Sequence, residues 1–206
     1  MNLKNEENLL EKIKQASITD EKIEEKIFKQ LFLQKEDIYN IEFSKNEFYN
    51  IDFQECNLEK NSFADCLFQN CNFSNSNLEK TTFIRCKFNN CKFTGTNIIE
   101  SRFYNINMEE INGNYCNFSN SILENCNFKN SIFRGSYFQE NRFKKINFNN
   151  VDFTSANFLK TKLKDIDFSS STISGIVVYK EDLNGAIINE MQAVELVGLL
   201  GVKISE

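Results

Sequence analysis

The chain has 206 residues, enough for one sizeable domain or one short solenoid. It contains 21 Phe and 7 Cys, has no His, Pro or Trp, and carries a net charge of −5, which neither requires nor excludes a basic partner. The N-terminus has no apolar run of signal-peptide length, and no segment is long enough to span a bilayer. We therefore expect a cytoplasmic protein, with no membrane partner, whose cysteines are thiols.

Residues 1–27 are expected to form a helical cap over the first coil of a repeat domain. An open solenoid end exposes apolar side chains and unpaired strand edges, so it needs a cover. An amphipathic stretch holds Leu9 and Ile13. Thr19 is suited to begin a helix, with Ile23 on its apolar face. The sequence leaves open whether this region forms one helix or two.

Residues 28–188 follow an unbroken five-residue repeat. Of the 33 positions whose numbers end in 3 or 8, 32 hold Phe, Leu, Ile, Met or Val, and the exception is Gly113. All cysteines lie two residues before such a position. The unit therefore has a small residue, a polar residue, a large apolar residue and two polar residues. This period fits neither a helix nor a plain strand.

This repeat resembles that of the pentapeptide-repeat family. The resemblance implies an all-β solenoid, a right-handed quadrilateral β-helix in which four five-residue sides make each coil. Residues 28–188 would then form about eight coils, stacked roughly 4.8 Å apart. Residues 20 apart would be stacked neighbours. Gly113 would leave a ring missing between Phe93 and Phe133, and we expect a distortion there, with Met108 or Tyr115 filling the space.

One face of such a rod is basic. The side centred on Phe43 and its stacked neighbours carries eight basic and five acidic outward residues. The basic candidates of an interaction surface on it are Arg142, Lys144, Lys145, Lys162 and Lys164. Two acidic candidates, Glu109 and Glu110, lie next to Gly113, the one region of the frame with room to bulge. The basic residues form either a solvated edge that keeps the rod soluble or a docking patch for an acidic surface.

Residues 189–206 are expected to form a C-terminal helix and tail. Asn189 precedes the helix and Gly201 ends it. The segment is more apolar than a cap requires, which indicates a homodimer interface. The residues predicted to form that interface are Met191, Val194, Val197, Leu200, Val202 and Ile204.

The stretch from Gln192 to Ile204 is similar to the tail of the quinolone-resistance (Qnr-type) branch of the family. That resemblance implies an end-to-end dimer of DNA-mimicking rods that bind DNA gyrase or topoisomerase IV and modulate fluoroquinolone sensitivity. The charge fits this function less well, because residues 101–150 carry 6 basic and 4 acidic side chains, a net of +2. The unbroken frame also leaves no obvious room for the projecting loops of many resistance proteins.

The alternative is a general protein-interaction scaffold without topoisomerase activity, using the basic face or an Asn-rich face. The Asn-rich candidates are Asn127, Asn130, Asn147, Asn149 and Asn150. An enzyme is not expected, because the chain has no His and its cysteines face inward, so no nucleophile–base pair is visible. We expect no cofactor and no direct nucleic-acid binding. We also expect no metal site, because no Cys spacing matches one.

Overall fold

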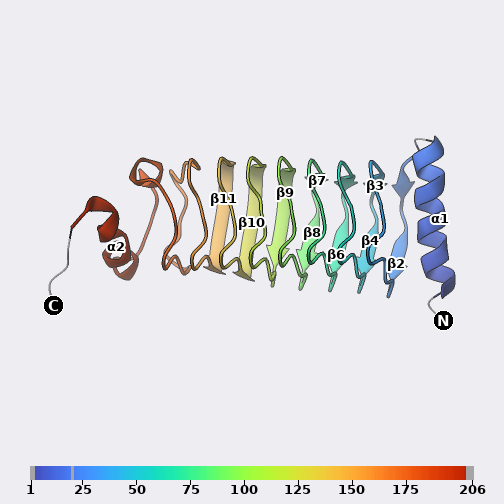
Figure 1. Cartoon of the computed structure of the whole chain (residues 1–206), viewed down its shortest axis with the longest axis horizontal. Coiled ribbons are helices and arrows are strands. Elements are labelled where there is room, and N and C mark those ends of the chain that lie inside the picture. Colours follow the sequence, from blue (N-terminus) through green and yellow to red (C-terminus); the bar gives the residue numbers. More distant parts are fainter. Residues whose placement is uncertain (1–2, 20, 203–206) are drawn as a thin grey trace.

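A computed structural model shows an elongated parallel β-solenoid with a helix at each end (Figure 1). The structure describes residues 3–19 and 21–202. Strands β1, β3, β5 and β7 form one side of the rod, and β2, β4, β6 and β8 form the next; β9, β10 and β11 turn from the first side into the second. The bounds are β1 Ile23–Glu24, β2 Ile27–Lys29, β3 Glu42–Ser44, β4 Glu47–Tyr49, β5 Ser62–Ala64, β6 Leu67–Gln69, β7 Thr82–Ile84, β8 Lys87–Asn89, β9 Arg102–Glu109, β10 Ile122–Ile132 and β11 Arg142–Asp152.

Each coil contains 20 residues, because every strand pairs in parallel with the residues 20 positions later. Ile23 lies opposite Phe43, and Leu123 opposite Phe143. The regular strands between Ile23 and Phe143 span about six turns, fewer than the eight coils expected. The remaining coils continue as isolated bridges, the last of which joins Asp167 to Ile187. Their backbones hold the same 20-residue register without forming long strands.

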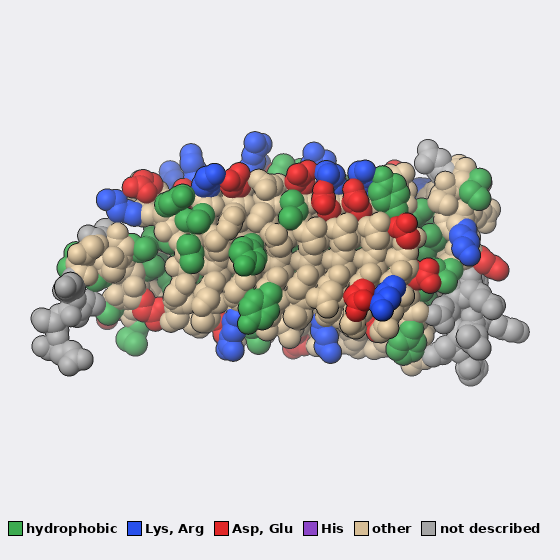
Figure 2. Space-filling view, in the orientation of Figure 1, with side chains coloured by type: hydrophobic (Ala, Val, Ile, Leu, Met, Phe, Trp, Pro, Cys, Tyr) green, Lys and Arg blue, Asp and Glu red, His purple; other side chains and the backbone are tan. Residues whose placement is uncertain are grey.

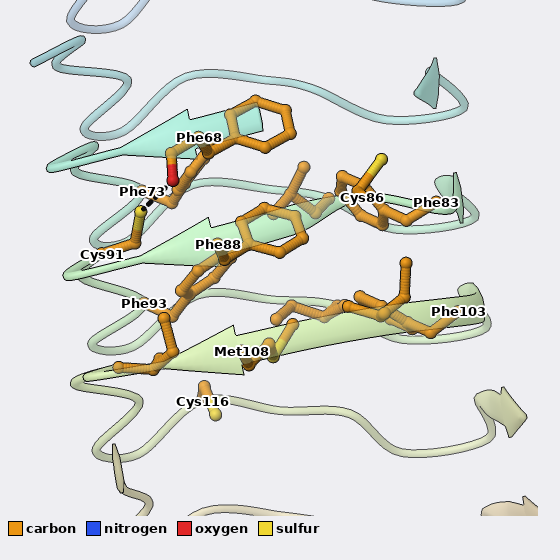
Figure 3. Close-up of a cluster of buried hydrophobic side chains, with 14 of the residues drawn as sticks. Phe68, Phe73, Phe83, Cys86, Phe88, Cys91, Phe93, Phe103, Met108 and Cys116 are labelled. Carbon is orange, nitrogen blue, oxygen red and sulfur yellow. Dashed lines mark hydrogen bonds between the residues drawn. The ribbon is translucent and has the colours of Figure 1, made fainter. Parts of the chain in front are cut away.

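The core is a set of stacked phenylalanine columns inside the rod (Figure 3). The rings of Phe48, Phe68 and Phe88 stack with centroids 4.8 and 4.7 Å apart and nearly parallel planes. Rings of adjacent columns meet edge to face, as Phe83 and Phe88 do at 5.4 Å. Each buried Phe contributes roughly 1.5–3 kcal/mol. Burial of these rings therefore accounts for the five-residue pattern of the sequence.

From Glu25 to Asp165, the corners of the coil place every fifth residue in the left-handed region of the backbone. Asn70, Lys80 and Arg85 have φ values of 55°, 56° and 52°. This conformation costs most L-residues about 1–2 kcal/mol and is tolerated best by Gly and Asn. Asn is accordingly frequent at the corners, although charged residues also occupy them. The corners thus hold charged side chains at fixed, outward-facing points.

Gly113 does not distort the coil, contrary to our expectation. Its N–H donates to the Ile132 carbonyl at 2.7 Å, and Asn112 beside it bridges to residues on both adjacent coils. The Phe133 ring, and neither Met108 nor Tyr115, fills the space: a Cβ on Gly113 would lie 2.3 Å from Cε1 of Phe133. Tyr115 points outward and is 67% exposed. Because the ring of the next coil leans into the gap, the backbone keeps its register.

The N-terminal helix α1 (Leu3–Thr19) lies across the first coil, where it contacts β1 and β2 (Figure 1). It buries Leu9, Ile13 and Ala16. The expectation that Thr19 begins a helix is wrong, because Thr19 ends α1 and Ile23 lies in a strand. The apolar residues after Thr19 thus belong to the first coil, where Ile23 is buried and Ile27 is exposed.

The C-terminal end consists of three short helices. They are η1 (Lys180–Leu183), α2 (Glu190–Leu196) and η2 (Val197–Leu200). Asn189 and Gln192 form a capping box at the start of α2, in which each side chain accepts a hydrogen bond from the other residue's backbone N–H. The Gln192 amide also donates to the carbonyls of Phe168 and Ser171 at 2.8 and 2.7 Å. These bonds fix α2 to the last coils.

Candidate functional site

The outer surface of the rod carries axial ion pairs between residues 20 positions apart. The pairs join Lys45 to Glu25, Arg85 to Asp65, Lys129 to Glu109, Lys144 to Glu124 and Lys160 to Glu140, with N–O distances of 2.6–2.9 Å. These pairs are exposed to solvent, so each adds little to the stability of the fold. The hydrogen-bonded guanidinium of Arg85 lowers the pKa of Asp65. The main effect of the five axial ion pairs is to neutralise carboxylates that would otherwise form an acidic surface.

The five basic candidate residues lie together on two adjacent coils, as expected from the 20-residue spacing. Arg142, Lys144 and Lys145 are all on β11, and Lys145 is at a corner of the coil, with φ of 54°. Lys162 and Lys164 lie one coil further along. All five are exposed, and Lys144 pairs with Glu124 across the ladder to β10. Figure 2 shows Lys and Arg side chains gathered along one long edge of the rod, with Asp and Glu among them.

The two acidic candidates lie apart from this basic group. Glu109 ends β9, two coils before β11, and its carboxylate contacts Lys129 at 2.7 Å. Glu110 occupies the next corner, with φ of 57°, and is exposed. The region does not bulge, because the Glu110 N–H donates to the Lys129 carbonyl at 3.1 Å. The predicted surface is therefore two separate groups on neighbouring sides of the rod.

The Asn-rich side carries hydrogen-bonded amide ladders. Asn147 donates to Asn127 at 2.9 Å, and Asn150 donates to Asn130 at 3.0 Å, in both cases from one coil to the preceding one. Asn149 lies on the same side, in β11. Because these amides bond to one another along the rod axis, they stabilise the stacking of coils.

The seven cysteine thiols are all free and buried in the core. Cys91 donates to the Phe68 carbonyl at 3.5 Å, and Figure 3 shows this contact. Burial raises the pKa of Cys56 to about 11 and that of Cys126 to about 12. Thiols of this kind stay protonated and are weak nucleophiles. Cys56, Cys91 and Cys126 therefore serve as small core residues whose thiols donate to backbone carbonyl groups.

The described ranges, 3–19 and 21–202, contain no group of three or more His, Cys, Asp or Glu side chains that could hold a metal ion. Within the same ranges, no helix has the length and apolar character required to cross a membrane.

The C-terminal end holds an apolar groove between the last coil and the terminal helices. Its volume is about 650 Å³. The lining residues are Lys180, Glu181, Leu183, Asn184, Ala186, Ile188, Ala193, Leu196, Val197 and Leu199. Among the described residues, α2 and η2 thus cover the apolar end of the rod incompletely. The sequence of the C-terminal segment predicted an apolar surface at this end. It did not predict that Leu183, Ala186 and Ile188 would form part of that surface.

The predicted interface residues surround this groove only in part. Met191 and Val194 on α2 and Val202 beyond it are 78%, 58% and 55% exposed. Val197 is half-buried and lines the groove. The side chain of Leu200, and Ile204 as a whole, lie outside the described residues. Leu196 and Leu199 also line the groove, and the helical spacing of the apolar residues is the signal that could have identified them.

This chain is similar to solved structures with which it shares little sequence identity. HetL, a pentapeptide-repeat protein involved in heterocyst differentiation regulation from the cyanobacterium Nostoc sp. strain PCC 7120, is 10% identical with a TM-score of 0.55; the match covers 85% of this chain and 90% of HetL. A trypsin-treated QnrB1, a plasmid-mediated fluoroquinolone resistance protein, is 14% identical with a TM-score of 0.43, over 87% of this chain and 99% of the other. Among curated proteins, no sequence matches this one.

The family assignment comes from the repeat itself. The family model for the pentapeptide repeat region matches residues 61–135 and 121–197, which together cover more than half of the chain. The matched region contains the 20-residue coils, the stacked rings and the left-handed corners described above. The chain therefore belongs to the pentapeptide-repeat family.

Proposed function

We propose that this chain is a rigid, non-enzymatic rod that binds another protein, and that its partner is a type II topoisomerase, DNA gyrase or topoisomerase IV. The observation that carries the proposal is the uninterrupted rod, whose coils are joined by backbone hydrogen bonds of 2.7–3.2 Å along most of its length. A stiff surface loses little conformational entropy when it binds, so it suits recognition of a large partner. The choice of topoisomerase rests on the Qnr-like sequence of the C-terminal tail.

The same proposal includes a homodimer formed through the C-terminal end. Met191 and Val194 expose apolar side chains beside the apolar groove, and both features lie at the open end of the rod. Burying them against a second copy would remove this surface from water and extend the rod. The dimer would therefore present a longer binding surface than one chain.

The support comes from shape and from the tail, and not from an acidic surface. The carboxylates of Glu109, Glu124 and Glu140 are each paired with a lysine on an adjacent coil. A rod with paired carboxylates repeats the charge of DNA poorly. We therefore infer that binding to a topoisomerase would use contacts other than close imitation of the phosphate backbone.

The experiment that tests this function is a supercoiling and DNA-cleavage assay of gyrase and topoisomerase IV with the purified protein. We expect altered supercoiling or cleavage at low micromolar concentrations, with or without a fluoroquinolone. The Val194→Asp variant is the matched control for the dimer, because it changes the exposed end and leaves the rod intact. Absence of any effect on either enzyme, with a folded protein, would exclude this partner.

A second candidate function is a scaffold for a different protein partner, without topoisomerase activity. It is favoured by the exposed basic group on two adjacent coils, which a mimic of DNA would not need. A folded protein that leaves both topoisomerases unaffected but binds an acidic protein would support this alternative.

A further inference from the structure

Like charges occupy equivalent places on two adjacent coils near the C-terminal end of the rod, where the Asn141–Thr161 hydrogen bond and the Asp152–Thr172 bridge keep the 20-residue register. Arg142 is followed 20 residues later by Lys162, and Lys144 by Lys164. Elsewhere, stacked charges are mostly of opposite sign, as in the axial ion pairs above. Like charges held close together on adjacent coils repel each other. This part of the rod therefore carries a local repulsion that the frame could have avoided.

The other like-charged positions on the rod have local compensation. Glu59 and Glu79 are stacked, and so are Lys60 and Lys80, but each lysine contacts the glutamate beside it, at 3.4 and 2.6 Å. Lys160 and Lys180 are also stacked, and the Glu140 carboxylate, 2.7 Å from Lys160, relieves their repulsion. Glu124 relieves Lys144 in the same way, at 2.6 Å, whereas no ion pair with a described residue relieves Arg142 and Lys162.

Four of the five basic candidate residues form no ion pair with any described residue: Arg142, Lys145, Lys162 and Lys164. We name these four residues the basic strip. All four are exposed. Asp165 follows Lys164, and Asp182 is stacked on Lys162, yet neither carboxylate lies within 4.0 Å of a basic group of the strip. The strip is thus a fixed group of cations without partners.

The charge of the rod changes sign on both sides of the strip. Residues 129–180 carry 9 basic and 4 acidic side chains, a net of +5. Residues 1–128 carry 14 basic and 20 acidic side chains, a net of −6, and residues 181–206 carry 1 and 5, a net of −4. A long polyanion lying along the rod would run from the strip onto negatively charged coils. A short anionic segment would not.

We propose that the basic strip binds a short run of Asp and Glu residues on a partner protein. Adjacent coils are about 4.8 Å apart, so the strip spans only a few residues of an extended segment. Binding would relieve the repulsion between Arg142 and Lys162, because carboxylates would enter between the stacked cations. The proposal rests on the protein-binding role of the rod and names the chemistry of the partner; it does not require that partner to be a topoisomerase.

The test is direct binding of a fluorescein-labelled peptide of eight glutamates to the full chain, measured by fluorescence anisotropy at low and at physiological ionic strength. The test variant is Arg142→Gln/Lys162→Gln. The matched control, Lys87→Gln/Lys92→Gln, removes the same charge from exposed lysines on two other sides. We expect the test variant to bind about fivefold more weakly than the wild type, and the control variant to bind like it at physiological salt, where distant charges are screened.

Two further measurements keep the outcome clear. The thermal midpoint of Arg142→Gln/Lys162→Gln should be equal to or above that of the wild type, because a repulsive pair is removed and folding is preserved. Arg142→Lys should keep most of the peptide affinity, since the charge remains. Equal peptide binding by the test and control variants would overturn the proposal, and so would tighter binding of a single-stranded oligonucleotide of eight nucleotides. None of these measurements contains a topoisomerase, so failure of the acidic-peptide proposal can be told apart from failure of the gyrase assay.

Discussion

The ring of Phe133 occupies the space that a side chain at Gly113 would need. A Cβ on Gly113 would approach Cδ1 and Cε1 of Phe133 to 2.4 and 2.3 Å. The displacement also shows on the other side of Phe133, whose centroid is 6.0 Å from that of Phe153, whereas Phe73 and Phe93 in the same column are 4.8 Å apart. One residue thus compensates for a gap in the coil before it.

We expect Gly113→Ala to destabilise the rod by about 1–3 kcal/mol, because the new methyl group overpacks the core against Phe133. Chemical denaturation measures the loss. In the background of Phe133→Leu the same substitution should cost clearly less, since the smaller side chain leaves room. Equal costs in both backgrounds would show that the two residues are not coupled.

Phe68→Ala should cost roughly 3–5 kcal/mol in free energy of unfolding. Phe68 is fully buried and stacks on Phe48 and Phe88, so removing its ring opens a cavity inside the rod. The control is Phe32→Ala, because Phe32 is the one Phe outside the frame and is 65% exposed. Its substitution should change stability by no more than about 0.5 kcal/mol. Similar losses for both variants would contradict the assignment of Phe68 to the core.

Light scattering should give about twice the mass of one chain for the wild-type protein, and the mass of one chain for Val194→Asp. Val194 is 58% exposed on α2, and a carboxylate there would be costly to bury against a second copy. Glu195→Asp is a suitable control on the same helix, because Glu195 is already charged and exposed. A wild-type monomer at all concentrations tested would exclude the dimer.

The buried thiols predict a loss of stability at alkaline pH. Burial raises the pKa of Cys56 to about 11, whereas an unfolded Cys titrates near about 8.5. The folded state therefore holds the thiol proton to higher pH than the unfolded state does. Its stabilising contribution is complete below about pH 8.5 and decreases as the pH rises towards 11.

Denaturation at a series of pH values measures this effect, and Cys56→Ser with Cys126→Ser serves as the comparison. The alkaline loss should be smaller in that variant than in the wild type. In the native protein at pH 8, a thiol reagent should modify the cysteines far more slowly than in the denatured chain. Rapid modification of the native protein would show that the thiols are accessible.

Much of the fold follows from the sequence because one period controls it. A large apolar residue every fifth position assigns Phe68, Phe88 and their equivalents to the core without any further information. The same period puts Arg142 and Lys162 at equivalent places on adjacent coils, and the hydrogen bond from the Asn141 N–H to Thr161 beside them keeps that register. Counting could reach this part of the candidate surface because spacing in the sequence becomes distance along the rod.

The remaining features depend on side-chain packing, which a period does not describe. Thr19 is a reasonable residue to begin a helix, but Ile23 has a place in the first coil, and burial there outweighs local helix preference. The filling of the Gly113 gap depends on the tilt of one ring. The groove at the C-terminal end depends on how far α2 reaches over Leu183 and Ile188, which neither segment specifies alone.

The 20-residue register has a consequence for how this rod can change in length. Loss or gain of a single residue in a coil would turn every later side chain to a different orientation, placing polar residues inside and Phe outside. Duplication or deletion of 20 consecutive residues would leave every remaining residue on its original side. A change that keeps both the core and the arrangement of the outer surface therefore comes in whole coils, and the distance between the two ends then takes a series of discrete values.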